Sequence, residues 1–164
     1  MAEETELATG KSIGDLGREA MWFILHTLFA VFFMALVVAA MSLLRPDPES
    51  SQPKLICTLF VFLIPAIAGM IIARSQKIDT ARYVWISGLI MFSVVCVWVL
   101  DLPTGPGQCE NCGAIAKLWR TFFAFDLSHG SGLMGGDGLL VGLWIPLSMI
   151  GYSLGAIFGL KSAE

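Results

Sequence analysis

The sequence predicts an all-α integral membrane protein, built as a bundle of four transmembrane helices. Three observations support this prediction. Hydrophobic residues make up 56% of the 164 residues and charged residues only 14%, whereas about 25% of the residues in soluble domains are charged. The apolar residues are concentrated in four runs, and no Asp, Glu, Lys or Arg lies within any of them. Each run is close to the roughly 20 residues that a helix needs to cross a bilayer.

The four predicted spans leave little of the chain outside the membrane. They cover residues 21–44, 55–73, 83–100 and 139–160. What remains is an acidic N-terminal segment, two short loops, one long outer loop at 101–138 and a short tail. None of these segments is long enough to bury a hydrophobic core of its own. We therefore expect residues 1–164 to form a single four-span membrane domain.

The positive charges outside the spans favour one orientation. Of the ten Lys and Arg residues, six lie on the side that holds both termini, and such residues prefer the cytoplasmic side. We therefore expect both termini inside (N-in/C-in), in a bacterial inner (plasma) membrane. The net charge of −3 and the lack of any run of Lys and Arg leave no electrostatic footprint for nucleic acid.

The last predicted span carries glycines at a helical spacing. Gly151, Gly155 and Gly159 are four residues apart and therefore lie on one helix face, where they form a smooth groove. Small residues of this kind let two membrane helices approach closely. The groove has two interpretations, packing within the bundle or docking of a partner. The expected partners are membrane lipid and either other membrane subunits or a second copy of the chain.

The long outer loop contains a segment with the pattern of an amphipathic helix. Its apolar positions are three and four residues apart, as one helix face requires. They are Ile115, Leu118, Trp119, Phe122 and Phe123. Because this segment is too short to span the membrane, we expect an interfacial helix between the third and fourth spans. Lipid or quinone binding at this outer interface is a weaker alternative function.

The four cysteines have several interpretations. Cys109 and Cys112 form a C-x-x-C pair in the outer loop, and Cys57 and Cys96 lie near the ends of spans on the same predicted side. The pair is either a structural disulfide or a redox pair, to which Cys57 or Cys96 would be joined. A metal site formed by Cys109, Cys112 and His129, with Asp137 as a fourth ligand, is a further alternative because zinc accepts such donors.

Four spans with an outer C-x-x-C pair resemble the architecture of the quinone-linked disulfide-forming enzymes, the DsbB and vitamin K epoxide reductase families. The resemblance implies thiol–disulfide exchange at Cys109 and Cys112 and a quinone as the cofactor. The cysteine positions depart from both families. The first outer loop, residues 45–54, contains no cysteine, and the pair lies well away from both flanking spans.

Apart from cysteine and tyrosine, the spans contain one ionisable side chain, that of His26. Ion pumps and voltage sensors carry charges inside the membrane, so this composition argues against both. We expect His26 to lie at the membrane interface, and no second histidine is placed to share a haem. The leading hypothesis is a non-catalytic accessory or structural subunit of a membrane complex, without a cofactor. The alternative is an extracytoplasmic thiol–disulfide oxidoreductase that uses Cys109 and Cys112.

Overall fold

The computed structural model describes residues 13–44, 51–77, 79–101, 103, 113–122 and 143–162. Every element in this part of the chain is a helix, which confirms the predicted all-α class. The elements are α1 (Ile13–Leu44), α2 (Ser51–Gln76), the 3-10 helix η2 (Asp79–Tyr83), α3 (Trp85–Asp101), α4 (Ala114–Phe122) and α5 (Trp144–Lys161).

Three helical stretches are long and apolar enough to cross a membrane. They are Gly14–Leu44, Leu55–Gln76 and Asp79–Asp101, the last of which joins η2 to α3. The chain is therefore a membrane protein. The fourth predicted span, residues 139–160, begins outside the described residues, and its described part, α5, is not among the three. At 1.5 Å per residue, α5 is about 27 Å long.

The helices extend beyond the apolar runs at several ends. The first begins at Ile13 rather than at Met21, and its first turns contain an ion pair between Asp15 and Arg18 at 3.1 Å. An acidic residue near a helix N-terminus is favourable because it complements the helix dipole. The second begins at Ser51 inside the predicted loop, with Pro53 in its first turn, where proline costs no hydrogen bond. Both helices therefore begin before the apolar runs that predict them.

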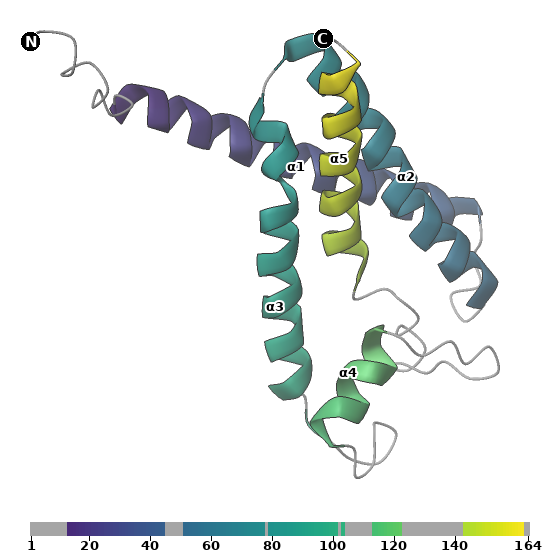
Figure 1. Ribbon diagram of the computed structural model, residues 1–164. Coiled ribbons are helices and arrows are strands. Elements are labelled where there is room, and N and C mark those ends of the chain that lie inside the picture. The colour runs from purple at the N-terminus through teal and green to yellow at the C-terminus, as the bar shows by residue number, and fades with distance from the viewer. Residues whose placement is uncertain are drawn as a thin grey trace, which may run out of the picture.

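Helix α5 is the centre of the structure. It contacts α1, α2, α3 and η2, and its contact with α2 is the most extensive of any pair. Figure 1 shows α2 and α5 running in the same direction, with α3 running the opposite way and α4 at the far end of α3. In the same view α1 runs across α3 and α5, and its N-terminal half projects away from the other helices (Figure 1).

The contact between α2 and α5 brings two helix backbones together. A Cβ atom added to Gly151, Gly155 or Gly159 would collide with a backbone carbonyl of α2. The carbonyls belong to Phe62, Ala66 and Met70 respectively. Both series advance by four residues, so the two helices are parallel and in constant register. Close approach of this kind is the main source of helix association in lipid, where hiding apolar surface contributes little.

Candidate functional site: a buried polar cluster around helix α5

Helices α5 and α1 are joined by a buried pair of polar rings. The Tyr152 hydroxyl lies 2.7 Å from Nδ1 of His26 on α1, and both side chains are fully buried. The hydroxyl donates to Nδ1 in one histidine tautomer and accepts from it in the other. This hydrogen bond joins the central helix to α1 across a region that is otherwise apolar.

The next residue of α5 links the helix to the start of α3. The Ser153 hydroxyl oxygen accepts a hydrogen bond from the backbone N–H of Trp85 at 2.7 Å. The same hydroxyl donates to the carbonyl oxygen of Ala81 in η2 at 3.4 Å. The first N–H groups of any helix lack partners within that helix. Ser153 therefore supplies, from a different helix, the cap that α3 requires.

Two more polar contacts connect neighbouring helices. The indole N–H of Trp144 on α5 donates to the Thr58 hydroxyl of α2 at 2.7 Å. The hydroxyls of Thr27 on α1 and Ser87 on α3 lie 3.2 Å apart. The His26–Tyr152 and Thr27–Ser87 contacts both attach α1 to other helices, and they come from adjacent residues of α1.

Two buried polar atoms among the described residues lack a hydrogen-bond partner: Nε2 of His26 and the hydroxyl of Thr80 in η2. Aromatic rings surround the histidine, with the ring centres of Trp22 and Phe29 at 6.0 and 6.4 Å. A metal centre is not formed here, because the described residues contain no group of three His, Cys, Asp or Glu side chains. Among the described residues, the titratable groups of this cluster are one imidazole and one phenol.

The sequence missed this cluster, although it singled out His26. The His26 side chain is fully buried. It lies well inside α1, because that helix begins at Ile13. Tyr152 was not recognised as a candidate. A tyrosine in a glycine- and serine-rich apolar helix is itself a signal, since a buried phenol hydroxyl usually finds a partner.

The structure describes two of the four cysteines, and both are free thiols. Cys57 is buried in a cluster with Val37 and Val61 of α1 and α2. Cys96 is half-buried and packs beside Val99 and Phe122 in a separate cluster. The structure therefore does not bring these two thiols together. The predicted pair Cys109 and Cys112, its disulfide, and His129 of the alternative metal site lie outside the described residues.

The apolar residues of α4 divide into two groups. Leu118 and Phe122 pack against α3, where the Phe122 ring centre lies 5.1 Å from that of Phe92. Ile115 and Trp119 are exposed, at 84% and 61%. Phe123 lies outside the described residues. Part of the predicted apolar face is therefore covered by α3.

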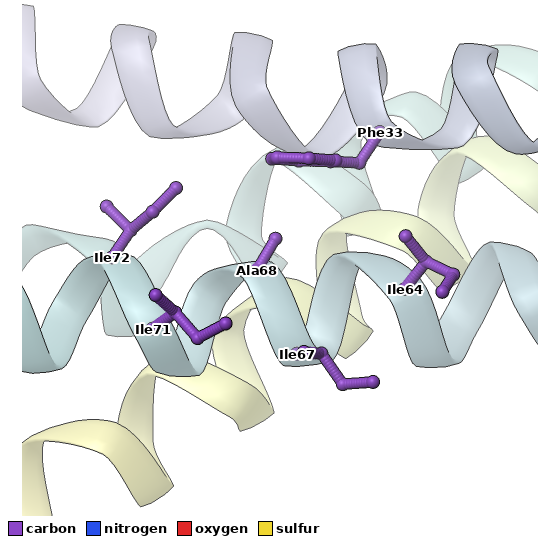
Figure 2. Close-up of a pocket in the computed structure, with 6 residues that line it drawn as sticks. All are labelled: Phe33, Ile64, Ile67, Ala68, Ile71 and Ile72. Carbon is purple, nitrogen blue, oxygen red and sulfur yellow. The ribbon is translucent and has the colours of Figure 1, made fainter.

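An apolar cleft of about 240 Å³ lies between α1 and α2. Its lining is carbon throughout and consists of Phe33, Ile64, Ile67, Ala68, Ile71 and Ile72. Figure 2 shows Phe33 reaching from α1 toward Ala68 on α2. Without a polar lining group, this cleft can hold a hydrocarbon chain but cannot orient a polar head.

No protein family, curated protein or solved structure matches the chain.

Proposed function

We propose that the chain is a non-catalytic accessory or structural subunit of a larger membrane complex. The observation that carries this proposal is the exposure of the first half of α1. The helix has 32 residues, yet no side chain described between positions 14 and 25 is buried. Because its own chain leaves half of this long helix uncovered, α1 is open to close packing against a helix of another subunit, the kind of contact that drives association in lipid.

The exposed side of α1 supports such a contact. Ile24, Leu28, Phe32 and Leu36 are spaced by four residues and are all largely exposed. His26, Ala30 and Val37, on other sides of the helix, are buried against the rest of the chain. This outward row presents a continuous apolar ridge, which can pack into the groove of a partner helix.

The interior of the molecule is consistent with a structural role. The hydroxyls of Tyr152 and Ser153 and the indole N–H of Trp144 all bond to other helices. Such groups fix the helices relative to one another and are not available to a substrate. The expected role is therefore to hold a rigid unit in the membrane and to present α1 to a partner.

The proposal includes four spans with both termini inside, in a bacterial inner membrane. Helix α5 runs parallel to the spanning helix α2 and has Trp144 and Lys161 at its two ends, residue types that favour the headgroup level. Its length of about 27 Å approaches the roughly 30 Å hydrocarbon thickness. We assign α4 to the outer membrane interface, with Ile115 and Trp119 as its lipid contacts.

The test compares two pairs of alanine substitutions that are matched in exposure and spacing. Leu28 and Phe32 on α1 are 59% and 55% exposed, and Ile90 and Val94 on α3 are likewise 59% and 55% exposed. Each double variant is tagged, expressed at native level, extracted in mild detergent and analysed by native mass spectrometry. We expect the wild type to retain further subunits. The Leu28→Ala/Phe32→Ala variant should lose them, and the Ile90→Ala/Val94→Ala variant should keep them.

Two results would contradict the proposal. One is a wild-type protein that leaves native membranes as a single 17.7 kDa chain. The other is an equal loss of subunits in both double variants, which would show that α1 has no special role.

The thiol–disulfide oxidoreductase remains the alternative proposal, and it depends on Cys109 and Cys112. The described residues do not favour a relay through Cys57 and Cys96, since these thiols occupy separate apolar clusters. Trapping of a mixed disulfide in a Cys112→Ala variant would support this alternative over a structural role.

A further inference from the structure

Four cations that are dispersed in the sequence lie at one end of the folded chain. Arg74, Lys77, Arg82 and Lys161 are all exposed. The first two belong to the end of α2, the third to η2 and the last to α5. Figure 1 shows the C-terminus beside the end of α2, at the top of the view. We call these four residues the basic end.

Packing fixes the segments that carry the basic end. Gly159 of α5 abuts Met70 of α2, so the parallel helices finish side by side. The η2 turn between α2 and α3 contacts both helices. Asp79 is the single acidic residue described in these segments. No ion pair to any of the four cations is formed within the described part of the chain, so the basic end has an excess of positive charge.

The backbone at Lys77 is unusual for a lysine. Its φ is 52°, a left-handed conformation in which glycine is the ordinary residue at a helix end. The Lys77 N–H donates to the Ala73 carbonyl at 2.9 Å, which closes the end of α2. Residues other than glycine are strained in this conformation. The position therefore retains a positive side chain where glycine would fit the backbone better.

Arg82 is positioned by an aromatic neighbour. Its guanidinium carbon lies 4.9 Å from the centre of the Tyr83 ring, within the range of a cation–π contact. Tyr83 is 43% exposed, and tyrosine favours the headgroup level of a bilayer. This contact holds the Arg82 charge beside an exposed ring of the type that favours the headgroup level.

We propose that the basic end binds the headgroups of anionic phospholipids. The four cations lie where the spanning helices leave the hydrocarbon, and anionic headgroups supply the complementary charge at that depth. At the opposite end, the Lys117 ammonium group donates to the Leu100 carbonyl at 3.0 Å.

The test measures lipid selectivity on the full-length chain in phosphatidylcholine bilayers. Spin-labelled phosphatidylglycerol and phosphatidylcholine report which lipid associates with the protein. We expect the wild type to prefer phosphatidylglycerol at low salt, by up to roughly fivefold for each cation in contact, and to lose most of this preference at high salt. Lys77→Gly should reduce the preference without loss of the fold, since glycine suits the backbone there. Arg82→Gln is a second variant with the same expected result.

Lys117→Gln is the matched control, because it removes one cation from the opposite end. It should leave the preference for phosphatidylglycerol unchanged. Equal association of the two lipids with the wild type would overturn the proposal. A preference that survives both Lys77→Gly and Arg82→Gln would also overturn it. The measurement needs no partner subunit, so its result is independent of the proposed role in a complex.

Discussion

Helices α1 and α5 differ in how the chain holds them. The central α5 has nine buried residues and meets α2 along a face of glycines. The longer α1 has three buried residues, His26, Ala30 and Val37. Two of its hydrogen bonds to other helices come from neighbouring positions, at His26 and Thr27. One helix is enclosed along its length, and the other is attached over part of it.

The difference shows what places a helix at the centre of a membrane protein. Apolar character does not, because α5 is about as apolar as α1 and less apolar than α3. In lipid an apolar surface gains little by being covered. Two features distinguish α5. Its backbone lies close to that of α2 along the glycine face that includes Gly155, and Tyr152 and Ser153 form hydrogen bonds to other helices. Three predictions test this contrast between the two helices.

The largest effect is expected from Gly155→Leu on α5. A Cβ atom at this position would lie 2.6 Å from the carbonyl carbon of Ala66 and 2.9 Å from its Cα, so the two backbones must separate. We expect the free energy of unfolding to fall by about 3 kcal/mol, at the upper end of overpacking effects. Denaturation in mixed micelles, followed by helix content, measures this change.

The same substitution on α1 is the control. A Cβ atom at Gly17 would have no neighbour within 4 Å, so Gly17→Leu meets no obstacle. Leucine is the better helix former by less than about 1 kcal/mol, and a neutral or slightly stabilising result is expected. Equal destabilisation by the two variants would show that α1 is packed as closely as α5.

An intermediate effect is expected when the bond between the two helices is broken. Tyr152→Phe removes the hydroxyl that bonds to His26 and leaves a buried ring nitrogen without a partner. We expect a loss of about 1–2 kcal/mol of stability. A double-mutant cycle with His26→Leu isolates the pair, and we expect a coupling energy near the average of about 0.6 kcal/mol for hydrogen bonds between membrane helices, and at most about 1.7 kcal/mol.

Ser42→Ala gives the reference for this cycle. The Ser42 hydroxyl is exposed and donates to the Val38 carbonyl of its own helix at 2.8 Å. It should therefore show no coupling with Tyr152→Phe. A zero coupling between His26 and Tyr152 would mean that α1 is held by apolar contacts alone.

The sequence predicts the helices well and the candidate site poorly, for a physical reason. Spans and the glycine face are periodic features of a single segment, so Gly151, Gly155 and Gly159 could be found from spacing. The His26–Tyr152 bond joins residues 126 positions apart, and no local pattern contains that pairing. The predicted topology already places Arg74, Lys77 and Lys161 on one side of the membrane, but the side-by-side ends of α2 and α5 depend on a glycine contact between distant segments. Likewise Phe122 belongs to an amphipathic pattern, but its burial depends on Phe92 of another helix.

The smallest effect is expected from Ala68→Leu, which projects into the cleft between α1 and α2. Two lining residues, Ile67 and Ile71, are 47% and 59% exposed, so the cleft is open at its side and lipid chains can fill it. A leucine there replaces one hydrocarbon by another, and we expect stability to change by no more than about 0.5 kcal/mol. Ala73→Leu, five residues further along α2, enlarges a fully buried side chain in the core cluster that contains Tyr152 and Ala156 of α5 and should destabilise far more, in the same micelle measurement. If Ala68→Leu proved as costly as Ala73→Leu, α1 would be packed against α2 as tightly as α5 is, and the two helices would not differ in the way proposed.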